Sequence, residues 1–314
     1  MSRIKYAKFY DAQQMLSMWR GKPESLKHIG NSASSVFKFE NKEGELQILK
    51  LTDSSFRSVE QAKGELEFIS HLSNSGCKVN KPVPSINGKN MLIYKSNNQS
   101  FVVTSFTFAK GEQVNSKSNY WNTKFFKSWG KSLGKIHQSS QDFTPKRKKL
   151  WEWNKEIIFV EMDKLIPKND LLSRKIISKT INRCEKVAKT KENYGVIHGD
   201  YGPQNFSYTD KIGITSFDFG NSCYHYFTSD LANIILFLKG KEKRRLIKKS
   251  LIEGYRTIKE LPANFDDVLS LFIKLRIQYI YLDRLYTSNF SNKIEDFKIL
   301  QQLKKRVHQE EKEW

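Results

Sequence analysis

The amino-acid sequence predicts an α+β fold with two lobes, a small β-rich N-terminal lobe and a larger, mainly helical C-terminal lobe. Strand-like apolar alternation dominates up to residue 106, whereas apolar residues at helical spacing dominate after Gly111. The 314 residues are 38% hydrophobic and 13% aromatic, which is enough to fill one large or two modest cores. We therefore predict an N-terminal lobe of residues 1–106 and a C-terminal lobe of residues 107–314, with a hinge at about 104–111.

The N-terminal lobe is expected to contain two strand pairs and one main helix. The first pair occupies residues 25–52, and the second is expected at 90–94 and 100–106. Apolar residues recur at helical spacing over residues 58–73, which predicts a helix between the two pairs.

The C-terminal lobe is expected to consist of helices that one short β-rich segment, residues 195–219, interrupts. A further helix, 271–286, has apolar residues all around it, which is typical of a buried helix. The other expected helices are 127–137, 151–165, 170–189, 230–238 and 243–258.

The chain is strongly basic. It has 54 Lys and Arg against 33 Asp and Glu, which gives a net charge of +21. A charge of this size attracts anions, but it does not identify a particular partner. Two basic runs, residues 145–149 and 239–249, carry much of the excess. No aromatic residues are interleaved with them, so we favour solvated loops and helix faces over a nucleic-acid-binding patch.

Cysteine usage and hydropathy indicate a cytoplasmic protein. Cys77, Cys184 and Cys223 are widely spaced and form no CxxC pair, so we expect reduced thiols rather than disulfides or a zinc site. No window reaches the ~18 consecutive apolar residues of a membrane span, and the N-terminal residues lack a signal-peptide pattern. We therefore expect no membrane partner.

The β-rich segment carries the residues with the clearest chemistry. Asp200 follows a short apolar strand, Asn205 comes five positions later, and Asp218 comes thirteen positions after Asn205 on a return strand. Carboxylate and amide oxygens are the hard ligands that suit Mg²⁺, which usually shares them with phosphate oxygens. Protein-kinase-like phosphotransferases use this spacing, so the segment predicts phosphoryl transfer.

These motifs resemble those of the aminoglycoside phosphotransferase and choline kinase family. The catalytic-loop pattern HGDxxxxN spans 198–205, a DFG follows at 218–220, and the resemblance extends over about residues 25–290. It implies a two-lobed protein-kinase-like fold and an ATP-dependent enzyme that moves the γ-phosphate to a hydroxyl of a small molecule. The acceptor classes that it implies are amino sugars, amino alcohols, sugars and antibiotics.

The resemblance also implies roles for single residues. Asp200 is expected to be the catalytic base, and Asn205 and Asp218 are expected to hold Mg²⁺. Lys50, positioned by Glu65, is expected to grip the phosphates of ATP, because a lysine on an apolar strand needs anionic partners.

The remaining ATP contacts are expected from the phosphate-covering loop and the hinge. The loop has one glycine where protein kinases have three, which leaves it less backbone freedom at positive φ. The expected contacts are Gly30 and Ser32 in the loop, Val36 and Ile48 beside adenine, and Thr107 and Ala109 in the hinge.

We interpret three polar residues of the C-terminal lobe, His198, Asp230 and His137, as structural. His198 is expected to brace the catalytic loop, and Asp230 is expected to tether it. His137 is expected to pack within its helix rather than bind a ligand, since no second His or carboxylate lies one helical turn away.

The acceptor site is expected on the buried helix 271–286. Arg276, Tyr279 and Asp283 lie on one face, and buried charges must be paired or serve a ligand. An internal Arg–Asp pair joining helices is the alternative, and the sequence leaves both open. The basic charge balance argues against a polycationic aminoglycoside as acceptor.

Two other function classes remain as alternatives to the kinase. One is a catalytically silent relative that serves as a binding or coat protein, against which the intact Asp200, Asn205, Asp218 and Lys50 argue. The other is a basic nucleic-acid-binding protein, which we do not expect. The sequence does not give the acceptor, the choice between ATP and GTP, or the oligomeric state.

Overall fold

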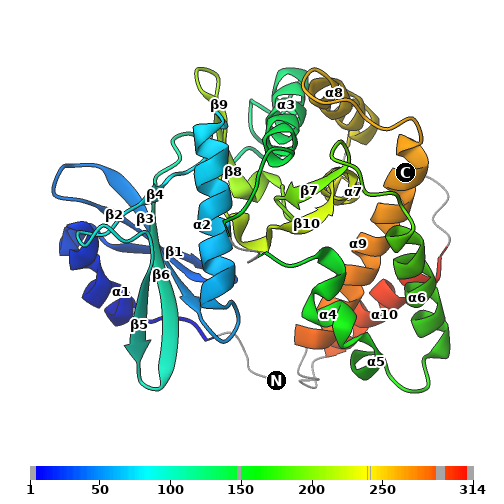
Figure 1. Ribbon diagram of the computed structural model, residues 1–314, viewed down its shortest axis with the longest axis horizontal. Coiled ribbons are helices and arrows are strands. Elements are labelled where there is room, and N and C mark those ends of the chain that lie inside the picture. Colours follow the sequence, from blue (N-terminus) through cyan, green and yellow to red (C-terminus); the bar gives the residue numbers. More distant parts are fainter. Residues whose placement is uncertain (1–4, 147–149, 239, 241, 288–293, 310–314) are drawn as a thin grey trace. The chain divides into compact units, whose positions relative to one another are not determined.

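The computed structural model describes residues 5–146, 150–238, 240, 242–287 and 294–309 (Figure 1). The chain forms two compact units. The first comprises Met1–Trp121, Asp142–Leu150 and Pro203–Asn221, and the second comprises Asn122–Gln141, Trp151–Gly202 and Ser222–Trp314. The first unit thus continues beyond residue 107 and takes in two later segments, and the lobe boundary at residues 106–107 stays a prediction.

The first unit is built on an antiparallel sheet of six strands. Both predicted strand regions of the N-terminal lobe are confirmed. The first of them, residues 25–52, contains three strands instead of two. The strands are β1 (Lys27–Asn31), β2 (Ser35–Glu40), β3 (Leu46–Asp53), β4 (Pro82–Val83), β5 (Leu92–Ser96) and β6 (Gln99–Thr107). They follow the order β1-β2-β3-β6-β4, and β5 also pairs with β6.

Strand alternation gives this sheet two different faces. Phe37 and Phe39 of β2 and Leu49 and Leu51 of β3 are fully buried in a core shared with α1 (Phe9–Leu16). The opposite face of β3 carries Lys50, which contacts α2 (Val59–Asn74). The sheet therefore lies between α1 and α2.

Local sequence explains both helices. Ser58 and Gln61 form a capping box at the start of α2, where the Gln61 N–H donates to Ser58 Oγ and the Ser58 N–H donates to Gln61 Oε1. This confirms the predicted helix. Helix α1 was not predicted, and Asp11, which accepts from the Lys8 N–H at 2.7 Å, marks its start.

Two further strands complete the first unit. β8 (Phe206–Thr209) and β9 (Gly213–Ser216) form a hairpin, flanked by the short 3₁₀ turns η4 (Pro203–Asn205) and η5 (Phe219–Asn221). The hairpin belongs to the predicted β-rich segment and carries the metal-binding candidates at one end.

The second unit is mainly helical, as predicted. Its main helices are α3 (Thr123–Ser140), α6 (Leu171–Glu185), α7 (Phe227–Phe237), α8 (Arg244–Arg256), α9 (Phe265–Thr287) and α10 (Ile294–His308). Two strands, β7 (Tyr194–Ile197) and β10 (Cys223–Tyr226), pair antiparallel. Neither α10 nor β10 was predicted.

The predicted helix 151–165 is wrong. A 3₁₀ turn, η3 (Trp153–Lys155), and two one-turn helices, α4 (Ile157–Val160) and α5 (Met162–Leu165), occupy this segment. Glu156 is extended, with φ −64° and ψ 139°, and interrupts the helix. Trp153 stacks on His225 of β10, so packing against another element overrides the local helical spacing.

Three sequence expectations concern features outside the secondary structure. Cys77, Cys184 and Cys223 are all buried, and none of them forms a disulfide within the described residues. In the part of the chain that the structure describes, every helix is too short or too polar to cross a membrane. Within the two predicted basic runs, residues 147–149, 239 and 241 lie outside the described residues.

Candidate active site

Four charged side chains meet on one face of the sheet in the first unit. Lys50 Nζ lies 2.9 Å from Asp218 Oδ1 and 3.5 Å from Glu65 Oε1. Arg57 Nη1 lies 3.4 Å from the other oxygen of Glu65. The structure thus confirms the predicted proximity of Lys50 and Glu65, and it adds an ion pair between Lys50 and Asp218 that was not predicted.

The surroundings keep Lys50 charged. Burial opposes ionisation of this side chain, but the carboxylates of Asp218 and Glu65 outweigh burial and hold the Lys50 pKa above its ordinary value. An ammonium group with two carboxylates is a cation fixed in place, which is what binding to phosphate oxygens requires.

Sequence reasoning missed Arg57. It is 6% exposed, contacts Glu65, and donates from Nη2 to Asn221 Oδ1 at 3.4 Å. A Cβ on Gly220 of the DFG would lie 1.9 Å from Arg57 Nη1, so this glycine is needed for the close approach. The arginine has no motif of its own, and no signal in the sequence points to it.

Asn205 and Asp218 lie at the same end of the β8–β9 hairpin. The Phe217 N–H donates to the Asn205 carbonyl at 2.9 Å, which continues the backbone hydrogen bonding of the hairpin one residue beyond the Phe206–Ser216 pair. Asp218 has φ +62°, a left-handed conformation that costs energy in a residue other than glycine and is typical of functional sites.

The donors at this end of the hairpin fit a magnesium ion. A carboxylate and an amide supply hard oxygen atoms. In the described part of the chain, no three His, Cys, Asp or Glu side chains form a cage for a metal. The residues thus fit an ion that takes one or two protein ligands and completes its shell with water and phosphate.

The predicted phosphate-covering loop is the tip of the β1–β2 hairpin. The Ser32 N–H donates to the Ser34 carbonyl, and Ser34 Oγ lies 2.6 Å from Thr52 Oγ1. Gly30 and the other residues from 27 to 40 all have negative φ. The shortage of glycine therefore creates no backbone strain in this loop.

The predicted adenine contacts follow the same face of the sheet. Val36 is the register partner of Lys50, and Ile48 is two residues before Lys50, so all three side chains share one face. In the hinge, the Thr107 N–H donates to the Lys81 carbonyl and the Phe108 N–H donates to the Leu46 carbonyl. Of the N–H groups of residues 107–109, that of Ala109 is the one without a backbone acceptor among the described residues, whereas Thr107 has its N–H occupied.

In the second unit, Asp230 holds the catalytic loop by its backbone. Its two carboxylate oxygens accept from the N–H groups of His198 and Gly199, each at 2.9 Å. Asn233 donates to the Gly199 carbonyl from the same helix, α7. The Asp200 N–H donates to His198 Nδ1 at 3.3 Å, so the predicted brace and the predicted tether both contact the loop.

His137 is also part of this network. Its Nε2 lies 3.2 Å from Asp230, and its Nδ1 lies 2.9 Å from the Tyr255 hydroxyl. Burial lowers the His137 pKa, although Asp230 opposes this shift. Burial also opposes ionisation of Asp230, but the hydrogen bond from His137 and its other contacts keep the Asp230 pKa low. Asp230 lies on α7 and His137 on α3, so a search for a carboxylate one helical turn from His137 does not find it.

The predicted acceptor residues lie on α9 near Asp200. Arg276 Nη2 is 3.9 Å from Asp200 Oδ1, and its guanidinium stacks on the Tyr279 ring at 4.6 Å. The Tyr279 hydroxyl donates to Glu156 Oε1 at 2.8 Å, a contact that sequence reasoning missed. A chain of contacts therefore joins the extended residue 156 to the predicted catalytic base.

Asp283 lies one to two helical turns beyond Arg276 and Tyr279. Burial raises the Asp283 pKa, although Arg276 and Arg284 oppose this shift. Among the described residues Asp283 forms no ion pair with Arg276, whose ion-pair partner is Asp200. Arg276 thus pairs with Asp200 of the catalytic loop and not with Asp283 of its own helix.

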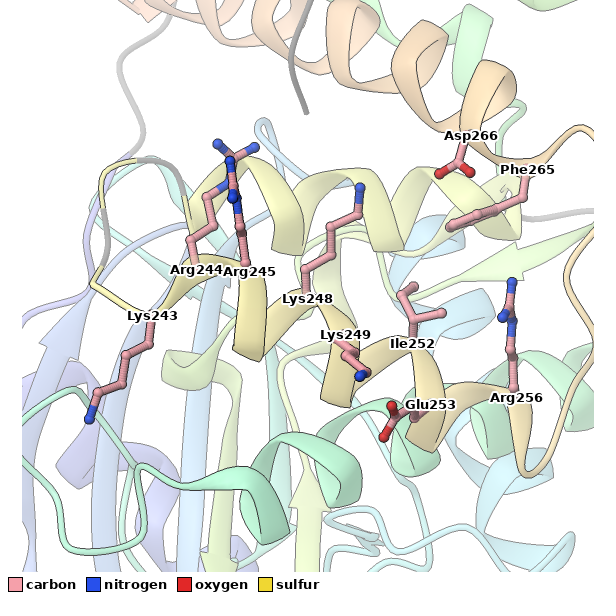
Figure 2. A pocket seen from close by; sticks show the side chains of 10 residues that line it. All are labelled: Lys243, Arg244, Arg245, Lys248, Lys249, Ile252, Glu253, Arg256, Phe265 and Asp266. Atoms are coloured by element: carbon pink, nitrogen blue, oxygen red, sulfur yellow. The ribbon is translucent and has the colours of Figure 1, made fainter.

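Residues 244–249 of the predicted basic run belong to α8, where Arg245 and Lys249 are exposed. Figure 2 shows basic side chains spread along α8 beside an open hollow of about 1040 Å³, which Glu253 of α8 and Asp266 of α9 also line. Glu253 pairs with Lys127 at 3.1 Å. Spread cations mixed with carboxylates are what a solvated helix face looks like.

Comparison with known proteins gives a consistent result. A model of the phosphotransferase enzyme family matches residues 25–262. An amicoumacin kinase of Bacillus subtilis (strain 168) is 27% identical over 252 residues, which are 76% of this chain and 74% of that protein.

Solved structures share the fold at lower identity. An amicoumacin kinase in complex with AMP-PNP, Ca²⁺ and Ami has a TM-score of 0.87 at 22% identity, covering 96% of this chain and 93% of that one. A microcompartment-associated aminopropanol kinase has a TM-score of 0.77 at 18% identity, covering 96% and 95%. The predicted α+β, kinase-like fold is confirmed.

Proposed function

Because the chain belongs to the phosphotransferase enzyme family, we propose that it is an ATP-dependent kinase whose acceptor is a small molecule with a hydroxyl and an amino group. Phosphoryl transfer to a small molecule is the activity of the family members that it resembles. The observation that carries the proposal is the family match over residues 25–262, which includes every predicted catalytic, metal-binding and ATP-binding residue.

We assign the reaction steps to residues of this chain. Asp200 orients the acceptor hydroxyl and takes its proton while the oxygen attacks the γ-phosphorus of ATP. The bond from the γ-phosphorus to the bridging oxygen breaks, and ADP leaves. Arg276, 3.9 Å from Asp200, holds the carboxylate in position before the acceptor binds.

The first unit binds the nucleotide in this proposal. Lys50, held between Glu65 and Asp218, contacts the phosphates, and Val36, Ile48 and the Ala109 N–H contact adenine. Asn205 and Asp218 would hold Mg²⁺, which would offset the negative charge of the ATP phosphates. The same assignment places the enzyme in the cytoplasm, where ATP and Mg²⁺ are available.

The charges on α9 support an acceptor with a single amino group. The Arg276 charge faces Asp200, whereas Asp283 and Glu156 supply carboxylates on the same side of the helix. An ammonium group beside Asp283 would favour its ionised form and offset the cost of burial. The relatives named for amicoumacin and aminopropanol support acceptors of this kind.

A panel of acceptors tests the proposal. Amicoumacin A and 1-amino-2-propanol are incubated with ATP and Mg²⁺, and the phosphorylated product is detected by mass spectrometry together with ADP release. The matched control is 1,2-propanediol, which lacks the amino group and is expected to be a poor acceptor. Equal turnover of the diol would contradict the amine requirement, and no product from any hydroxyl compound would contradict the kinase assignment.

The acceptor residues are tested by kinetics once an acceptor is found. Replacing Asp283 by Asn is expected to raise the acceptor KM about tenfold while the ATP KM and thermal stability change little. A large fall in melting temperature with an unchanged KM would make Asp283 structural instead.

A further inference from the structure

A second basic hollow in the second unit differs from the open face of α8. It lies between α6, α9 and α10 and has a volume of about 210 Å³. Cationic side chains from all three helices line it, namely Lys179, Arg183, Lys274 and Arg306. No Asp or Glu is among the described residues that line it.

This convergence of charge needs an explanation. Positive side chains gathered around one small volume repel one another, and an anion in their midst removes that cost. On α8, by contrast, the cations spread along a hollow about five times larger, whose lining also includes the carboxylates of Glu253 and Asp266 (Figure 2). The smaller hollow therefore has the electrostatics of an anion site.

Gln278 adds an independent observation. It lines the hollow, is 2% exposed, and donates from Nε2 to Thr180 Oγ1 at 2.9 Å. Thr180 Oγ1 donates in turn to the Ile176 carbonyl, so it has no hydrogen left for the amide. The Gln278 Oε1 atom is buried and accepts no hydrogen bond from the described residues.

An orphaned buried acceptor in the wall of a pocket calls for a donor from a ligand. The cations require an anion, and Gln278 requires a hydroxyl or N–H group on the same molecule. The volume is below the ~300–1,000 Å³ of sites for drug-sized ligands, so the ligand has to be small.

We propose that the hollow between α6, α9 and α10 is a binding site for a small phosphate monoester that carries a hydroxyl group. The phosphate lies among Lys179, Arg183 and Lys274, and the hydroxyl donates to Gln278 Oε1. None of these residues belongs to the nucleotide or acceptor site, so the proposal does not depend on the identity of the acceptor.

Calorimetry with glycerol 3-phosphate tests the site. The full chain is first saturated with AMP-PNP and Mg²⁺, so that the nucleotide site is occupied, and the titration is done at low salt. One-to-one saturable binding is expected. Replacing both Lys179 and Lys274 by Gln is expected to weaken binding at least about tenfold. Absence of saturable binding by the wild-type chain would overturn the proposal.

A matched control separates a site from a general field effect. Lys175 and Lys305 are exposed residues of α6 and α10 that do not line the hollow, and replacing both by Gln changes the net charge equally. This control is expected to bind as the wild type does. An equal loss of affinity in both double variants would show attraction by overall charge and would overturn the site.

The role of Gln278 is tested by comparing two probes. Wild type is expected to bind glycerol 3-phosphate about five- to tenfold more tightly than methyl phosphate, which has no hydroxyl group on its carbon. Gln278→Met, similar in shape but without the amide, is expected to remove this preference while keeping methyl phosphate binding. A preference that survives in the variant would overturn the assignment of the hydroxyl.

Discussion

Asp200 is the residue on which the proposed proton transfer depends. Replacing it by Asn keeps the size of the side chain and removes the carboxylate, so phosphoryl transfer is expected to fall by about 10²–10⁴-fold or more. The binding of AMP-PNP is expected to stay within a factor of a few, because Lys50 and Asp218 are unchanged. Calorimetry and a product assay measure both quantities. Turnover close to that of wild type would contradict the mechanism.

His225 is expected to make folding sensitive to acid. Burial lowers the His225 pKa from 6.5 to about 3, and its Nδ1 accepts from the Tyr226 N–H. Below pH 6.5 His225 becomes protonated in the unfolded chain but stays neutral in the folded chain, so the stability of the fold decreases as the pH falls. Between pH 7 and pH 5 this residue is expected to cost about 2 kcal/mol of stability.

The test of His225 compares pH dependences rather than absolute stabilities. Urea unfolding at pH 7 and pH 5 is measured for wild type and for His225→Asn, whose side-chain oxygen can still accept from the Tyr226 N–H. The variant is expected to lose less stability between the two pH values. His28→Asn, which removes an exposed histidine, is the control. A pH dependence unchanged in His225→Asn would disprove the assignment.

At this scale, the sequence predicts residues in motifs and misses residues that act through packing. Asp200, Asn205 and Asp218 are recognisable because their spacing along the chain reflects one loop and one hairpin. Lys50 is recognisable as a lysine on an apolar strand, which needs anionic partners. Arg57 and Glu156 are not recognisable, since Arg57 contacts Asn221 and Glu156 contacts Tyr279, residues far away in the sequence. Distant contacts depend on tertiary packing, which residue spacing does not encode.

At the scale of elements, the close contact of α3 and α8 depends on two glycines. A Cβ on Gly130 would lie 1.8 Å from the Leu251 carbonyl oxygen, and a Cβ on Gly254 would lie 2.0 Å from the Lys127 carbonyl oxygen. Backbone atoms have little room to move, so Gly254→Ala is expected to destabilise the fold by at least ~1–3 kcal/mol. Urea unfolding measures this change.

Gly134→Ala is the matched control for the helix contact. It lies on α3 as Gly130 does, but its Cβ would meet the nearest atom, Cβ of Ile258, at 3.1 Å. The Tyr255 carbonyl oxygen follows at 3.2 Å, and both contacts need a far smaller shift than the 2.0 Å contact at Gly254, so the expected loss is smaller. Equal effects of Gly134→Ala and Gly254→Ala would mean that backbone contact does not decide the stability of this pair.

Elements were predictable where local signals agree with packing. The capping box at Ser58 and the turn at Asn74–Gly76 bound α2 closely. The segment 151–165 fails because Trp153 packs on β10 and Glu156 is extended. β10 is only four residues long and forms through pairing with β7. Its own residues therefore carry no local pattern that predicts a strand.

At the scale of the whole molecule, the net charge of +21 raises the question of nucleic-acid binding. Weak binding to duplex DNA is expected at low salt because any strongly basic surface attracts a polyanion. A dedicated site with 6–10 phosphate contacts would lose about 10³–10⁵ in affinity between 50 and 200 mM salt, from a tight starting value. The spread and mixed charges of α8 predict binding that is already weak at 50 mM.

The last prediction tests this with charge removal on α8. Arg245 and Lys249 are exposed and contact no part of the proposed catalytic machinery, and replacing both by Gln lowers the net charge by two, to +19. Phosphoryl transfer is expected to be unchanged, and DNA affinity at low salt is expected to fall only a few-fold. DNA titrations at several salt concentrations, beside the kinase assay, measure both. Tight binding at 150 mM salt that the double variant abolishes would instead make α8 a nucleic-acid site, because only a cluster of simultaneous phosphate contacts keeps high affinity at that ionic strength.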